Sequence, residues 1–145
     1  MKVPRFDCPK GKREAILAVL REAIAARPEV AFAYAYGSFL EDRPFHDIDV
    51  GIYVVGMDAR EAGAMALDLA FELESALAKV RRFPVDVRVL NWAPVGFCYH
   101  VLRGRLLFSR DEDVRVRWTT HILSRYLDLK PLRHRALKEA MTSWR

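Results

Sequence analysis

Two segments of this chain alternate strictly between apolar and polar positions, and they constrain the fold more than any other feature. In residues 47–54 every second side chain is Ile or Val, and the intervening positions begin with Asp47 and Asp49. Residues 85–90 repeat the pattern, with Val at alternate positions and Asp86 between the first two. A period of two is typical of a β-strand with one face on the core. The sequence therefore predicts two strands that carry carboxylates on their polar faces.

The other segments alternate between helical and strand patterns. We expect helices in residues 10–27, 58–82, 94–103 and 111–129 and further strands in residues 30–36 and 105–108. Asp58 is a plausible N-cap, with Glu61 at the capping-box position. Pro131 should break the last long helix, with a final helical segment after it. The inward side of that helix is expected to hold Val114, Trp118, Ile122, Tyr126 and Leu129. This order predicts an α/β (α+β) fold, a small mixed β-sheet with helices packed against it.

Length and composition favour a single soluble domain. The 145 residues are 52% apolar and 30% charged, which is ordinary for a globular protein. We expect one domain over 1–145, with a core at about 10–110 and a C-terminal helical segment at about 111–143. No apolar run approaches the roughly 20 residues of a membrane span, and the N-terminus does not resemble a signal peptide. A cytoplasmic protein without a membrane partner is the expectation. Two cysteines and four scattered histidines match no disulfide or zinc pattern.

The positive charge is concentrated at the C-terminal end. Residues 101–145 hold 11 Lys and Arg against 5 Asp and Glu, whereas residues 1–100 hold 13 against 14. A solvated helix surface explains this slightly better than a face for nucleotide phosphates, RNA or an acidic protein. Direct binding of nucleic acid is therefore not favoured. Arg115, Arg117 and Arg125 remain candidates to frame an acidic surface of a partner.

The three aspartates are candidate metal ligands. Asp47 and Asp49 lie on one strand face about 7 Å apart, where two carboxylates repel each other unless a cation separates them. Mg²⁺ prefers oxygen ligands of this kind together with phosphate oxygens. If the two acidic strands are neighbours, Asp86 joins them and the cluster suffices for two metal ions. Taken singly, each aspartate is better explained as a strand-edge residue or an arginine partner; taken together, the metal site is the better explanation.

A Gly-Ser pair supplies a candidate phosphate site. Gly37 and Ser38 end the strand at 30–36 and stand shortly before Asp47. Glycine lets the backbone approach a phosphate closely, and a serine hydroxyl with the following amides can donate hydrogen bonds to phosphate oxygens. Tyr36 is the aromatic residue of this strand that we expect nearest to the site. A Gly-Ser turn alone is weak support, but its position between the strand and the aspartates makes it specific.

These residues resemble the nucleotidyltransferase superfamily with the DNA polymerase β fold. The resemblance rests on Tyr36-Gly-Ser-Phe-Leu-Glu-Asp-Arg-Pro-Phe-His-Asp-Ile-Asp-Val50 and Val85-Asp-Val87, and it covers about residues 10–130. Asn91-Trp-Ala-Pro94 and Arg103-Gly-Arg-Leu-Leu-Phe108 are similar to the small single-domain branch, the minimal nucleotidyltransferases, called MNT or MntA antitoxins. Two departures stand out. Only eight residues separate Ser38 from Asp47, a shorter loop than is usual, and His46 precedes Asp47 where serine is common.

The resemblance implies a function and a role for each residue. Gly37 and Ser38 would hold the triphosphate of ATP, and Asp47 and Asp49 would bind two Mg²⁺ ions. Asp86 would bind the catalytic ion and help to deprotonate the acceptor hydroxyl. Members of this branch pair with a HEPN-domain toxin, an RNase, and silence it by transferring AMP from ATP to a toxin tyrosine.

Two other functions stay open. The same centre is able to serve a transferase for a small molecule or an RNA end, although such enzymes usually carry an added acceptor-binding domain. A non-catalytic module that neutralises its partner by contact is the other.

Overall fold

The computed structural model describes residues 5–41 and 43–142, apart from the side chains of 129, 130 and 133. Its elements follow the predicted order of helices and strands, with one added 3₁₀ turn. They are α1 (Lys10–Ala25), β1 (Val30–Tyr36), η1 (Ser38–Leu40), β2 (Ile48–Val54), α2 (Ala59–Leu77), β3 (Val85–Val89), α3 (Val95–Leu102), β4 (Arg105–Ser109) and α4 (Glu112–Thr142). The predicted mixed α/β class is confirmed. None of the helices within the described ranges combines the length and apolarity that a membrane crossing requires.

The four strands form one mixed sheet in the order β3-β2-β1-β4. β1 pairs antiparallel with both β2 and β4, whereas β2 and β3 run parallel. A parallel pair needs a crossover connection, and α2 provides it between β2 and β3. This pairing makes the two acidic strands direct neighbours, as the predicted metal cluster requires.

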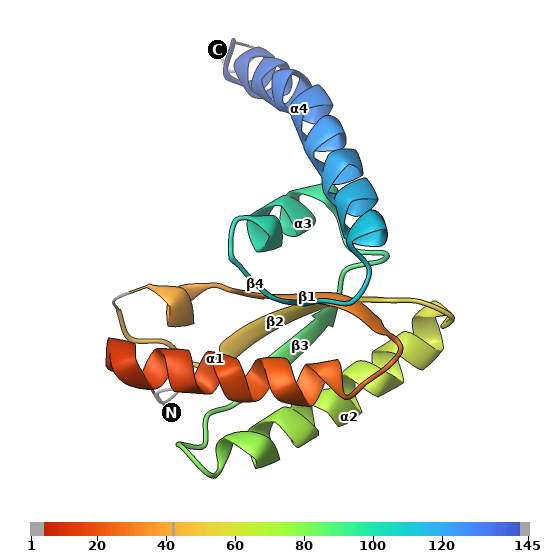
Figure 1. Ribbon diagram of the computed structural model, residues 1–145. Helices are drawn as coiled ribbons and strands as arrows, with labels where there is room; N and C mark the ends of the chain where they lie inside the picture. Colours follow the sequence, from red (N-terminus) through yellow and green to blue (C-terminus); the bar gives the residue numbers. More distant parts are fainter. Residues whose placement is uncertain (1–4, 42, 143–145) are drawn as a thin grey trace.

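Helices cover both faces of the sheet (Figure 1). α1 and α2 pack on one face over the larger apolar cluster, which includes Leu20, Ile52 and Leu69. α3 and the start of α4 lie on the other face over a smaller, more aromatic cluster that includes Phe32 and Trp118. Because both faces are covered, all seven residues of the central strand β1 are buried. Asp49 and Tyr53 alternate with buried apolar residues of β2, as the period of two predicts.

The start of α2 confirms the predicted capping box. The Asp58 side chain accepts from the Glu61 backbone N–H at 2.8 Å, while Glu61 Oε1 accepts from the Asp58 N–H. These bonds satisfy donors that the first turn of a helix leaves without a partner. The helix ends at Leu77 rather than near residue 82, and the chain then turns so that Phe83 is buried beneath the sheet.

We expect Asp58→Ala to lower the stability of the fold by about 1 kcal/mol, because it removes the side-chain acceptor of this cap. For a protein of this size the melting temperature should fall by about 3 °C. Thermal unfolding followed by circular dichroism measures the effect. Asp68→Ala, which removes an exposed carboxylate from the middle of the same helix, serves as the matched control. Equal melting temperatures of the two variants would contradict the assigned role of the cap.

The predicted break at Pro131 is wrong, because α4 continues through this residue to Thr142. A proline has a backbone φ suited to a helix, but it removes one N–H and crowds the carbonyl four residues earlier. That carbonyl belongs to Leu127, which is 64% exposed, so water is able to take the place of the lost donor. The predicted inward side holds for Trp118 and Ile122, which are buried, and for Val114 and Tyr126, which are partly buried. The side chain of Leu129 lies outside the described residues.

Candidate active site

The strand register brings the predicted site residues to one edge of the sheet. Asp49 of β2 lies opposite Asp86 of β3 in the parallel pair and opposite Tyr36 of β1 in the antiparallel pair. Asp47 directly precedes β2. Because β1 runs antiparallel to β2, the end of β1 and the following Gly37 lie beside the beginning of β2. The predicted site residues Gly37, Asp47, Asp49 and Asp86 therefore lie at the same edge. Ser38 follows Gly37 as the first residue of η1.

The carboxylates of Asp47, Asp49 and Asp86 form a compact acidic cluster. One oxygen from each carboxylate lies within 4.8 Å of the other two, and all three residues are partly exposed. Burial first, and then the charges of Asp47 and Asp86, raise the pKa of Asp49 from its ordinary 3.8 to about 7. The negative charges of the three carboxylates are therefore not fully balanced by positive charge in the folded protein.

This acidic cluster fits a hard divalent cation. Three carboxylate oxygens at mutual reach suit Mg²⁺, and a cation among them would relieve the repulsion that, after burial, raises the pKa of Asp49. Arg88 compensates the acids only in part. Its Nε donates to Asp86 Oδ2 at 3.1 Å from a largely exposed side chain. The ion pair expected for a lone aspartate is thus present at Asp86, alongside the cluster.

The backbone of Gly37 takes a conformation and a position that suit glycine alone. Its φ is +86°, a left-handed value that side chains rarely permit. A Cβ atom at this position would lie 2.5 Å from Oδ2 of Asp49. Glycine therefore allows the turn after β1 to approach the acidic cluster closely. The next residue, Ser38, is partly exposed beside it.

Tyr36 and α3 form an aromatic wall beside the cluster that sequence reasoning found only in part. Tyr36, the aromatic residue expected nearest the site, is buried, and burial with the neighbouring charge of Asp49 raises the pKa of its phenol. Phe97 and His100 of α3 stand edge-on to its ring, at centroid distances of 5.6 and 5.7 Å. A helix was predicted here, but nothing in its pattern shows which strand it would cover.

Gly104 holds α3 against β1, and its role was also missed. A Cβ atom here would collide with the carbonyl oxygen of Ala35, and it would lie 3.0 Å from Cβ of Tyr36. The close approach of this turn to β1 therefore requires glycine. A lone glycine between two arginines was the only signal in the sequence.

Comparison with known proteins identifies the family of this chain. Residues 19–113 match the family described as Polymerase beta, Nucleotidyltransferase. The chain belongs to this family. The predicted resemblance to the polymerase β nucleotidyltransferases is thereby confirmed over most of the chain. Among curated proteins, no match was found.

Several solved structures share the fold of this nucleotidyltransferase. One is a complex of a tri-AMPylated Shewanella oneidensis HEPN toxin with an MNT antitoxin. It aligns at 22% identity over 91% of this chain and 98% of that chain, with a TM-score of 0.59. The MntA–HepT toxin–antitoxin structure aligns at 23% identity over 92% and 99%, with a TM-score of 0.58. A toxin–antitoxin structure with AMP-PNP aligns at 23% identity over 89% and 98%, with a TM-score of 0.61.

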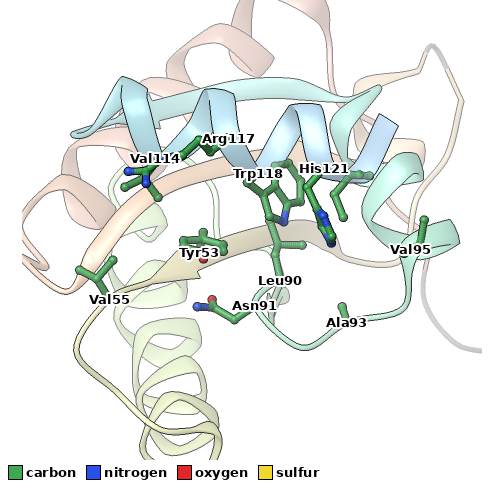
Figure 2. Close-up of a pocket in the computed structure, with 11 residues that line it drawn as sticks. Tyr53, Val55, Leu90, Asn91, Ala93, Val95, Val114, Arg117, Trp118 and His121 are labelled. Atoms are coloured by element: carbon green, nitrogen blue, oxygen red, sulfur yellow. The ribbon is translucent and has the colours of Figure 1, made fainter. Parts of the chain in front are cut away.

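A pocket of about 540 Å³ lies on the sheet face that α3 and the start of α4 cover, away from the acidic cluster. Figure 2 shows Trp118 and His121 reaching from α4 above Leu90, with Tyr53 beside them. Tyr53 is four residues beyond Asp49 along β2, about 13 Å at the rise of a strand. This pocket and the acidic cluster therefore occupy opposite ends of the sheet.

Proposed function

We propose that this chain is a Mg²⁺-dependent nucleotidyltransferase that transfers AMP from ATP to a tyrosine of a HEPN-type toxin and so acts as its antitoxin. The acidic cluster carries this proposal, because three carboxylates within 4.8 Å of one another stand at a glycine turn in a polymerase β nucleotidyltransferase. Similar folds in complex with a tri-AMPylated toxin and with AMP-PNP support the choice of acceptor and nucleotide. We place the reaction in the cytoplasm, where ATP and a toxic RNase would meet.

The proposed site residues divide the work between metal and phosphate. Asp47, Asp49 and Asp86 would hold two Mg²⁺ ions, which when bound neutralise phosphate charge and favour the ionised acceptor hydroxyl. Gly37 would let the triphosphate lie against the backbone, and the Ser38 hydroxyl would donate to a phosphate oxygen. Tyr36, a phenol whose pKa burial raises above its ordinary 10.0, stays protonated and would form the wall beside these groups rather than accept a proton.

The proposed reaction is an in-line displacement at the α-phosphorus of ATP. The tyrosine oxygen of the toxin forms a bond to this phosphorus, and the bond between the phosphorus and the β-phosphate oxygen breaks. Pyrophosphate leaves with the electron pair of that bond. The proton of the tyrosine hydroxyl passes to Asp86, which faces the acceptor side in this scheme. The products are tyrosyl-AMP on the toxin, pyrophosphate and one proton released to solvent.

One labelling experiment tests the proposed function. The chain is incubated with α-labelled ATP, Mg²⁺ and the purified product of the neighbouring gene, beside an Asp47→Asn/Asp49→Asn double variant. We expect label on a tyrosine of the partner with the wild type and none with the variant. A partner that is bound and silenced without label would instead indicate a contact-only module. Label found only on RNA or on a small molecule would indicate the other class of transferase.

We also expect Mg²⁺ to stabilise the folded chain, because the ion would bind the acidic cluster only when β2 and β3 are paired. At a concentration about 100 times the dissociation constant, the gain is about 2.7 kcal/mol. Differential scanning calorimetry with and without Mg²⁺ measures it as a rise in melting temperature. The Asp47→Asn/Asp49→Asn variant should show no such rise. An equal rise in both proteins would place the ion elsewhere.

A further inference from the structure

The second half of α4 extends beyond the rest of the protein. Near the middle of this helix, the ring of Tyr126 stacks on Tyr99 of α3 with 3.7 Å between the ring centroids. Every described side chain from residue 127 to residue 142 is exposed. At the rise of an α-helix these residues span about 24 Å. Figure 1 shows this part of α4 pointing away from the sheet.

From Leu123 onward, one side of α4 carries four exposed apolar side chains, while a fifth, Leu132, is 57% exposed on the opposite side. Leu123, Leu127, Leu137 and Met141 are 38%, 64%, 64% and 76% exposed. Leu127, Leu137 and Met141 follow Leu123 by 4, 14 and 18 residues. These spacings place all four side chains on one face of a helix. We call these four side chains the α4 apolar row. Large apolar side chains aligned in this way are typical of a face that another helix covers.

The stability of the projecting segment also points to a covering partner. An isolated helix of this length is marginal in water, and most helical stability in proteins comes from packing of an apolar face. Pro131 weakens this segment further, because it removes one hydrogen bond from the middle of it. Among the described residues, packing against the body ends near Tyr126. A partner that covers the α4 apolar row would supply the missing stabilisation.

The charges beside the row select the kind of partner. His134 and Lys138 stand 11 and 15 residues after Leu123, on or next to the same face. Asp128 and Glu139 fall on the opposite side of the helix by the same count. Two copies of α4 paired through this row would bring basic groups together and leave the acids outside, which disfavours a self-dimer. A helix whose apolar row is bordered by Asp and Glu is the complementary surface.

We propose that the α4 apolar row is the docking surface for an acidic, amphipathic helix of the partner protein. The identity of that partner as the toxin rests on the proposed function. Docking on α4 leaves the acidic cluster at the edge of the sheet open to nucleotide. The helix therefore serves to bind the acceptor protein, and the sheet serves to modify it.

A pair of matched double variants tests this docking surface. Leu127→Glu/Leu137→Glu introduces acids into the α4 apolar row. Leu67→Glu/Phe71→Glu makes the same change at two apolar side chains of α2 that are 67% and 69% exposed. Because all four residues are exposed, both variants should keep the circular dichroism spectrum and ATP affinity of the wild type. Binding of the purified neighbouring-gene product is measured by isothermal titration calorimetry.

We expect the α4 variant to bind the partner at least about 100-fold more weakly and the α2 variant to bind it like the wild type. Lys138→Glu should weaken binding as well, because it removes the charge complementary to an acidic helix. Unchanged binding by the α4 variant, or a loss confined to the α2 variant, would overturn the proposal. A wild-type dimer in light scattering that the α4 variant converts to monomer would show that a second copy covers the row instead.

The labelling assay separates this proposal from the proposed function. If the wild type binds the partner through the α4 apolar row but transfers no AMP, the docking surface stands and the proposed reaction is wrong. If the α4 variant modifies the partner with the wild-type KM, the reaction stands and the docking surface is wrong. A wild type that fails to bind the neighbouring-gene product at all counts against both.

Discussion

Asp49→Asn is expected to lower the rate of AMP transfer by at least about 10³-fold, which corresponds to about 4 kcal/mol of transition-state stabilisation. Asp49 lies opposite Asp86 in the register and two residues after Asp47 in the chain. The amide has nearly the same size but lacks the charge that would bind Mg²⁺. The rate is measured with α-labelled ATP at saturating Mg²⁺ and partner.

Asp68→Asn is the matched control for this substitution, because it makes the same change at an exposed aspartate of α2. This control should retain the wild-type rate. If Asp49→Asn retained activity, the acidic cluster would not be needed for AMP transfer. A loss of activity in both proteins would instead indicate a general effect of charge on the fold.

Asp49→Asn should also raise the melting temperature of the metal-free protein, and more at pH 8 than at pH 5. Burial and the neighbouring carboxylates raise the pKa of Asp49 from 3.8 to about 7. An acid whose pKa is raised on folding destabilises the fold when it is ionised. That penalty is absent below pH 3.8, grows as the pH rises, and is complete above about pH 7. Asparagine removes the penalty, so a lower melting temperature than the wild type at pH 8 would contradict this account.

The sequence predicts the faces of the acidic strands better than it predicts their partners. The period of two places Asp49 on the polar face of β2 and Asp86 on that of β3, and the structure agrees, although Asp47 directly precedes β2 instead of lying within it. Whether Asp49 meets Asp86 depends on parallel pairing in one particular register. That register is a property of tertiary packing, which no local pattern encodes.

The remaining differences arise where solvent or tertiary packing outweighs local preference. Pro131 should end a helix on local grounds, yet α4 continues because its surroundings are exposed to water. The position of His100 against Tyr36 depends on how α3 crosses the sheet, so the pattern of the helix alone is uninformative. By contrast, the cap at Asp58 is formed within one turn and was predictable from four residues.

Gly37→Ala is expected to lower AMP transfer by at least about 100-fold through steric pressure on the acidic cluster. The new Cβ would lie 2.5 Å from Oδ2 of Asp49, so either this carboxylate or the turn must move. The φ of +86° adds backbone strain of about 1 kcal/mol for any side chain. Activity is measured by labelling, and stability by chemical denaturation.

Gly56→Ala separates the two effects. Gly56 has a φ of +73°, so alanine there meets similar backbone strain, but a Cβ atom at this position has open space around it. Both variants should therefore lose a similar amount of stability, while only Gly37→Ala should lose activity and the thermal response to Mg²⁺. Equal losses of activity would mean that strain in the fold is responsible. An active Gly37→Ala protein would show that the glycine turn does not need to approach Asp49 for transfer to occur.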